Sequence, residues 1–130
     1  MVDATVSDRI RVLVVVDSDD PGSALEHLLR ASDGIACVGH VTDAEAMLTT
    51  IREGATQVVL GDLTMPGLDP FEAIAELKRI APLARVITFS GYDDDATQRR
   101  AKLAGAEAFL ATQVQLEEIT RVIHALVGSG

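Results

Sequence analysis

The chain has 130 residues, of which 48% are hydrophobic, and a formal net charge of −9. This length suits one ordinary domain with a sizeable core, and the acidic balance disfavours direct contact with the phosphate backbone of a nucleic acid. The single cysteine, Cys37, cannot form an internal disulfide. No apolar run approaches the length of a membrane span, and the polar N-terminus lacks the apolar core of a signal peptide. We therefore expect a cytoplasmic protein.

Short apolar runs alternate with amphipathic runs along the first half of the chain. Each apolar run is rich in β-branched residues and is typical of a buried strand. Each amphipathic run repeats its apolar residues at helical spacing, as Leu25, Leu28 and Leu29 do on one face of the first predicted helix. In chain order we predict a strand at 10–16, a helix at 21–31, a strand at 35–41, a helix between Asp43 and Gly54, and a strand at 57–61.

The same alternation continues to the end of the chain. Asp69 and Pro70 supply an N-cap and a first helical residue, and Gly105 ends a later polar helix. The succession of five strand–helix units predicts an α/β fold with a five-stranded parallel sheet and helices on both of its faces. We therefore predict one domain over residues 10–127, with tails at 1–9 and 128–130. The remaining elements are predicted as a helix at 70–80, a strand at 84–89, a helix at 93–104, a strand at 106–110 and a helix at 116–126.

Acidic and hydroxyl side chains follow three of the predicted strands. Asp17, Asp19 and Asp20 follow the first strand, Asp62 follows the third and Ser90 follows the fourth. Ligands of an open doubly wound sheet bind beyond the carboxyl ends of the strands, and a strand order of 2-1-3-4-5 would place Asp17 beside Asp62. Two close carboxylates need a cation, and oxygen ligands suit Mg²⁺. A metal, a carboxylate and a hydroxyl form a workable site for phosphoryl transfer, although each acidic residue alone could be only a helix N-cap.

The segment from Val59 to Asp69, VLGDLTMPGLD, resembles the phospho-acceptor segment of response-regulator receiver domains. Residues 86–92 resemble the fourth strand of those domains with its switch hydroxyl, and residues 104–110 resemble their fifth strand. The likeness extends from about Arg11 to Val127. It implies a flavodoxin-like fold and a signalling role in a two-component phosphorelay. It implies no enzyme activity beyond self-phosphorylation from small donors and self-dephosphorylation.

The resemblance implies a role for each matching residue. Asp62 would accept a phosphoryl group from a sensor histidine kinase or a phosphotransfer protein, and Asp17, Asp62 and the backbone carbonyl of Thr64 would bind Mg²⁺. Ser90 would be the switch hydroxyl and Phe109 the aromatic switch, although Phe109 could equally be a plain core aromatic. The face made by the fourth helix, the fifth strand and the fifth helix would meet a downstream protein, or a second copy in a homodimer.

Two positions depart from the family pattern. Val16 stands where the family has the first of two adjacent acids, and Thr112 replaces the usual lysine. We therefore expect weaker Mg²⁺ binding and the loss of a charged hydrogen bond worth about 1.5–3 kcal/mol. The same departures support an alternative, a phosphorylation-independent pseudo-receiver that binds a partner protein. A remote alternative is a haloacid-dehalogenase-type phosphatase that uses Asp17 and Asp19, although the later lysine and paired acids of that family are missing.

Overall fold

The computed structural model describes residues 9–16, 19–62, 69–90, 95–111 and 114–128. Strands and helices alternate five times over these residues, and their bounds differ from the predicted ones by at most two residues. The strands are β1 (Ile10–Val15), β2 (Ile35–Val41), β3 (Val58–Asp62), β4 (Arg85–Ser90) and β5 (Ala108–Ala111). The helices are α2 (Asp19–Arg30), α3 (Ala44–Arg52), α4 (Pro70–Ile80), α5 (Asp95–Ala104) and α6 (Leu116–Gly128).

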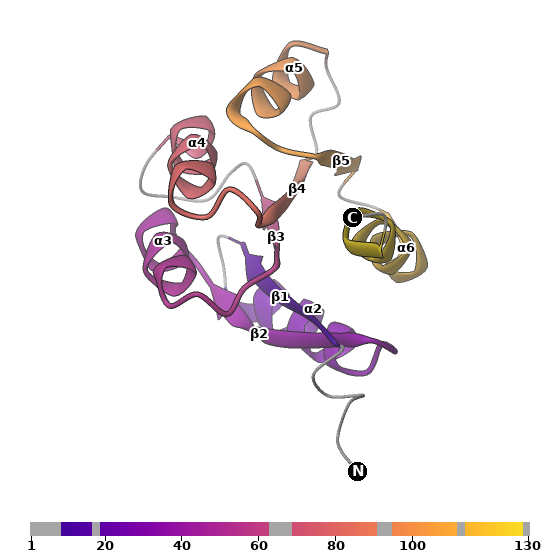
Figure 1. Cartoon of the computed structure of the whole chain (residues 1–130). Helices are drawn as coiled ribbons and strands as arrows, with labels where there is room; N and C mark the ends of the chain where they lie inside the picture. Colours follow the sequence, from indigo (N-terminus) through magenta and orange to yellow (C-terminus); the bar gives the residue numbers. More distant parts are fainter. Residues whose placement is uncertain (1–8, 17–18, 63–68, 91–94, 112–113, 129–130) are drawn as a thin grey trace.

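The five strands form one parallel sheet in the order β2-β1-β3-β4-β5, as predicted. Helices α2 and α6 lie on one face of this sheet, and α3, α4 and α5 lie on the other (Figure 1). The strand order reverses between β1 and β3. Ligands of such folds bind at the carboxyl ends of the strands beside this reversal, so the topology directs attention to the residues that follow β1 and β3.

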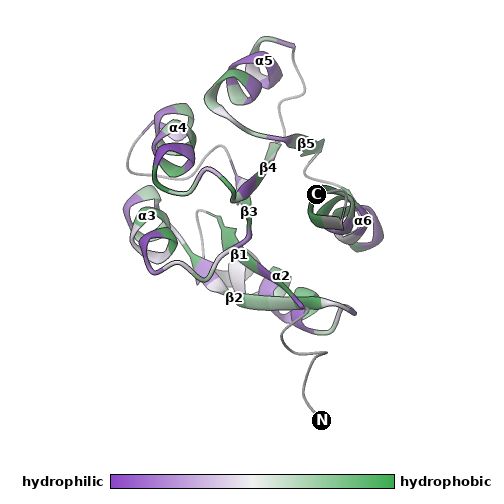
Figure 2. Ribbon diagram, viewed as in Figure 1, coloured by the Kyte–Doolittle hydropathy of each residue, from purple (hydrophilic) through white to green (hydrophobic). Residues whose placement is uncertain are grey.

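The core has two halves because side chains alternate across each strand. Leu13 and Val15 of β1 belong to the cluster that packs under α3 and α4, whereas Val12, Val14 and Val16 belong to the cluster that packs under α2 and α6. In Figure 2, α6 carries hydrophobic residues toward the sheet and hydrophilic residues on its outer side. A sheet covered on both faces needs strands that are apolar on both sides, and this explains the nearly continuous apolar run of β1.

The predicted helix ends are confirmed. The Asp43 carboxylate accepts a hydrogen bond of 2.8 Å from the backbone N–H of Ala46 at the start of α3. The Asp69 carboxylate accepts hydrogen bonds from the backbone of α4, which begins at Pro70. Gly105 follows α5 with φ of +125°, a conformation that disfavours residues with a Cβ atom. Among the described residues, no helix is both long enough and apolar enough to cross a membrane.

The predicted apolar face of α2 needs a correction. Leu29 is fully buried and Leu25 is partly buried, but the side chain of Leu28 is 47% exposed. The buried stripe of this helix follows Gly22, Leu25 and Leu29, at spacings of three and four residues, and is too narrow to include Leu28. Cys37 on β2 is buried.

Strand β2 contains an irregularity at the edge of the sheet. Val12 pairs with Cys37, whereas the next residue, Leu13, pairs with Gly39, so Val38 has no partner in the register. Gly39 has φ of +144°. One extra residue opposite a regular neighbour is a β-bulge, which bends the strand locally.

Candidate functional site

Asp62 is the last residue of the central strand β3. Parallel pairing places Gly61 opposite Val15 of β1 on one side and Asp62 opposite Phe89 of β4 on the other. The Asp62 side chain is partly buried. The sheet thus holds one carboxylate at the carboxyl edge, between the ends of β1 and β4, where the strand order reverses.

The structure locates some of the predicted site residues and leaves others outside the described residues. Ser90 follows Phe89 as the last residue of β4 and pairs with Ala111, so its backbone lies on the strand beside Asp62. Asp17, Thr64 and Thr112 fall outside the described residues. Within the described ranges, no three histidine, cysteine, aspartate or glutamate side chains are grouped to hold a metal ion. The predicted pairing of Asp17 with Asp62 therefore stays a prediction.

Val16 is part of the hydrophobic core. Its side chain is 4% exposed and belongs to the apolar cluster under α2 and α6. Its backbone N–H donates a hydrogen bond of 3.1 Å to the carbonyl of Val41 on β2. This position therefore contributes hydrophobic packing between β1 and α2 and adds no negative charge to the edge of the sheet.

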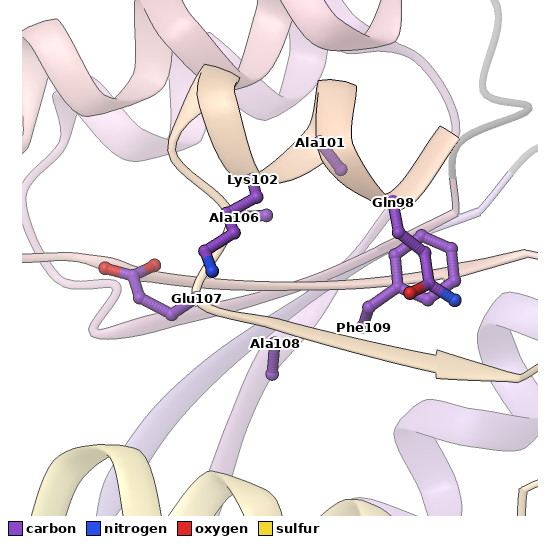
Figure 3. A pocket seen from close by; sticks show the side chains of 7 residues that line it. All are labelled: Gln98, Ala101, Lys102, Ala106, Glu107, Ala108 and Phe109. Atoms are coloured by element: carbon purple, nitrogen blue, oxygen red, sulfur yellow. The ribbon is translucent and has the colours of Figure 1, made fainter. Parts of the chain in front are cut away.

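Phe109 lies on β5, opposite Thr88 of β4, and packs against the cluster under α3 and α4. It also borders a pocket of about 200 Å³ between β5 and α5. Figure 3 shows Gln98 and Lys102 extending from α5 toward this pocket and Phe109 entering it from β5. Phe109 thus combines core contacts with open space on one side, which is compatible with both of its predicted roles.

Glu107 organises a group of contacts that the sequence did not reveal. Its carboxylate accepts a hydrogen bond of 2.7 Å from the backbone N–H of Val86 and one of 2.6 Å from Lys78 Nζ. Lys78 Nζ also donates to the carbonyl of Ala84, at 2.7 Å. This group joins α4, β4 and the start of β5, two residues before Phe109. Glu107 is 21 residues from Val86 and 29 residues from Lys78 in the chain, so no local pattern could have predicted these two contacts.

Two further contacts join pairs of elements elsewhere in the fold. The Arg100 guanidinium of α5 lies 4.1 Å from the centre of the Phe71 ring in the first turn of α4, a distance suited to a cation–π interaction. On the α2 side, His40 Nδ1 lies 2.7 Å from Glu26 Oε1, and Arg30 approaches the other oxygen of the same carboxylate. The ring contact gives Arg100 a role in joining α5 to α4.

Comparison with known proteins gives a consistent result. The family model of the response regulator receiver domain matches residues 12–124. The response regulator GacA of Pseudomonas protegens is 34% identical over 115 residues, which are 88% of this chain and 54% of that protein. The chain spans about half the length of the first curated relatives it matches.

Two solved structures show the same fold at related sequence. The receiver domain of the putative response regulator NarL from Mycobacterium tuberculosis has a TM-score of 0.83 and 29% identity, covering 93% of this chain and 98% of that one. A LuxR-family two-component response regulator from Aurantimonas has a TM-score of 0.84 and 26% identity, covering 92% and 86%. The strand order, the position of Asp62 and the family match agree with one another. The chain therefore belongs to the response regulator receiver domains of two-component systems.

Proposed function

We propose that this receiver domain accepts a phosphoryl group on Asp62. The observation that carries the proposal is the position of this partly buried carboxylate at the end of the central strand, between the ends of β1 and β4. Two neighbouring strands fix the backbone at Asp62, and phosphoryl transfer depends mainly on such positioning and on charge neutralisation. The donor would be the phosphohistidine of a sensor histidine kinase or of a phosphotransfer protein.

The transfer exchanges one bond for another. An Asp62 carboxylate oxygen attacks the phosphorus atom, the bond between phosphorus and the imidazole nitrogen breaks, and the released imidazole takes up a proton. The product is an acyl phosphate, which water can later hydrolyse to the free carboxylate and inorganic phosphate.

The Asp62 carboxylate is an oxygen ligand of the kind that Mg²⁺ prefers, so the described part of the site fits this ion. Asp17 and the backbone carbonyl of Thr64 would complete the ligand set. When bound, Mg²⁺ would offset the negative charge that gathers at this edge of the sheet. Because the buried Val16 stands where the family has an acid, we expect weak binding of the ion.

Ser90 and Phe109 would carry the response. Ser90 ends the strand beside Asp62, where a hydroxyl could donate to a phosphoryl oxygen, and Phe109 lies one strand further from Asp62. Phosphorylation would then bias a two-state equilibrium of the face formed by α5, β5 and α6. That face would contact a downstream protein or a second copy of the chain.

Labelling by acetyl phosphate, followed by intact-mass measurement, tests the acceptor. We expect addition of one phosphoryl group in the presence of Mg²⁺, little addition after chelation, and none in Asp62→Asn. Asp69→Asn is a matched control, because asparagine can also cap α4, and it should label like the unmodified chain. Equal labelling of Asp62→Asn would refute the assignment.

A beryllofluoride titration followed by amide NMR tests the switch. With Mg²⁺ present, we expect shifts near Asp62 and Ser90 that extend to Phe109. Phe109→Leu should keep the shifts near Asp62 and lose those on α5. If Phe109→Leu leaves the shifts on α5 intact, then Phe109 is a core aromatic only.

The buried Val16 favours one alternative, a pseudo-receiver that binds a partner without phosphate. Partner binding would then be unchanged by Asp62→Ala and by chelation of Mg²⁺. Membership of the receiver family favours signalling over the phosphatase alternative based on Asp17 and Asp19, and turnover of a generic phosphate ester would revive the latter.

A further inference from the structure

A second, apolar cavity lies on the opposite face of the sheet from the pocket beside Phe109. Its volume is about 120 Å³. It lies between helices α2 and α6, which cover that face (Figure 1), and against the last residues of the central strands. Each described residue that lines it is apolar. The lining residues are Leu25, Leu60, Phe89, Leu110, Val114 and Ile119.

The lining offers little to a water molecule. A buried water typically needs two to four polar partners. Leu60 and Phe89 belong to strands β3 and β4, which pair on both sides, so their backbone polar groups are used within the sheet. The other described lining residues are the apolar Leu25 of α2, Leu110 of β5, Ile119 of α6 and Val114 just before α6, so most of the lining surface is apolar. The cavity is therefore suited to an apolar occupant.

We propose that this cavity binds one small apolar molecule, no larger than benzene. Apolar cavities of roughly 150 Å³ lined by leucine, isoleucine and phenylalanine stay dry and accept benzene or xenon. The volume here is of the same order and excludes larger aromatic compounds. Binding would be driven by burial of the ligand's apolar surface. It would also be driven by dispersion contacts between the ligand and lining side chains that face empty space when the cavity is unoccupied.

The cavity is next to the proposed acceptor site in the chain as well as in space. Leu60 comes two residues before Asp62, Phe89 directly precedes Ser90, and Leu110 directly follows Phe109. A bound molecule would contact β3, β4, β5 and the first turns of α6 at once, and would hold them together. Binding itself requires no phosphorylation, so the inference stands or fails separately from the role proposed for Asp62.

Methyl NMR with xenon and with benzene tests the site directly. We expect saturable shifts that are confined to the methyl groups of Leu25, Leu60, Leu110, Val114 and Ile119. Leu25→Phe places a ring in the cavity and should abolish the saturable shifts. Leu28→Phe is the matched control on the same helix, because Leu28 is largely exposed and does not line the cavity, and it should bind like the unmodified chain.

A second variant keeps the test decisive if Leu25→Phe does not fold. Leu25→Ala enlarges the cavity and should extend binding from benzene to toluene. The proposal is overturned if saturating benzene or xenon produces no saturable shifts, if the shifts spread over the surface, or if Leu25→Phe folds and still binds. A phosphoryl-labelling defect alone would leave the cavity result unaffected.

Discussion

The contact between Lys78 and Glu107 should make a measurable contribution to stability. Both side chains are mostly buried, with exposures of 20% and 22%. Lys78→Met removes the ammonium from the Glu107 carboxylate and from the carbonyl of Ala84, while the methionine keeps most of the apolar stem. The carboxylate that remains is still hydrogen-bonded to the backbone N–H of Val86 and lies 3.7 Å from Arg85.

The expected magnitude follows from these contacts. A hydrogen bond to a charged partner contributes about 1.5–3 kcal/mol, so we expect a coupling energy of that size between Lys78 and Glu107. The single change Lys78→Met loses a second hydrogen bond as well and should cost about 2–4 kcal/mol. With a urea slope of about 2 kcal/mol/M, this destabilisation lowers the unfolding midpoint by about 1–2 M.

A double-mutant cycle with Lys78→Met and Glu107→Gln, measured by urea unfolding, isolates the coupling. The control cycle uses Arg121→Met and Glu118→Gln. Arg121 and Glu118 form an exposed ion pair on α6, three residues apart in the same helix. Its coupling should be only about 0.2–0.5 kcal/mol. Equal couplings in the two cycles would show that burial does not strengthen the interaction between Lys78 and Glu107.

Three further predictions concern other parts of the fold. Gly22→Ala should destabilise by about 1–3 kcal/mol in thermal unfolding, because the added Cβ would lie 2.6 Å from the His40 ring. In a His40→Ala background the same change should cost less, because only the Val16 side chain, at 3.1 Å, would still lie close to the added Cβ. Asp43→Ala should cost about 1 kcal/mol in urea unfolding through loss of the N-cap of α3, and rescue by Asp43→Asn would separate capping from charge. Burial raises the pKa of the Cys37 thiol above its ordinary value of 9.0. The folded state therefore holds the thiol proton more tightly, and this contribution to stability is complete below the ordinary pKa and decreases as pH rises above it. Stability measured from pH 8 to pH 11 should fall more steeply for the unmodified chain than for Cys37→Ala, and parallel profiles would contradict the assignment.

The strands and helices could be predicted from the sequence because the periodicity of apolar residues and the capping residues at helix ends are local features. The cap at Asp43 and the start of α4 at Pro70 follow from patterns within a few residues. The order of the strands was expected from the alternation of strands and helices and from the resemblance to receiver domains. The exposure of Leu28 was missed because spacing alone does not show how wide a stripe of a helix contacts the sheet. That width depends on the neighbouring helix and on the curvature of the sheet.

Of the residues in and around the candidate site, the sequence predicted only those at the ends of strands. Asp62 and Ser90 were found because parallel strands bring their carboxyl ends to one edge. The contacts of Glu107 with Lys78, and of Arg100 with Phe71, join elements that are distant in the chain, and they depend on side-chain directions that only the packed structure defines. The apolar cavity could not be predicted from the sequence either, because it depends on how six side chains from different elements pack together.

The bulge in β2 bears on how the domain avoids self-aggregation. An edge strand presents unpaired N–H and C=O groups to which the strand of another molecule could add. The extra residue Val38 and the unusual backbone of Gly39 interrupt the regular spacing of these groups on β2. At the other edge, β5 has only four residues. Each edge is therefore a poor template for intermolecular β-sheet growth, and removing Val38 to regularise β2 should favour fibril formation by the concentrated protein.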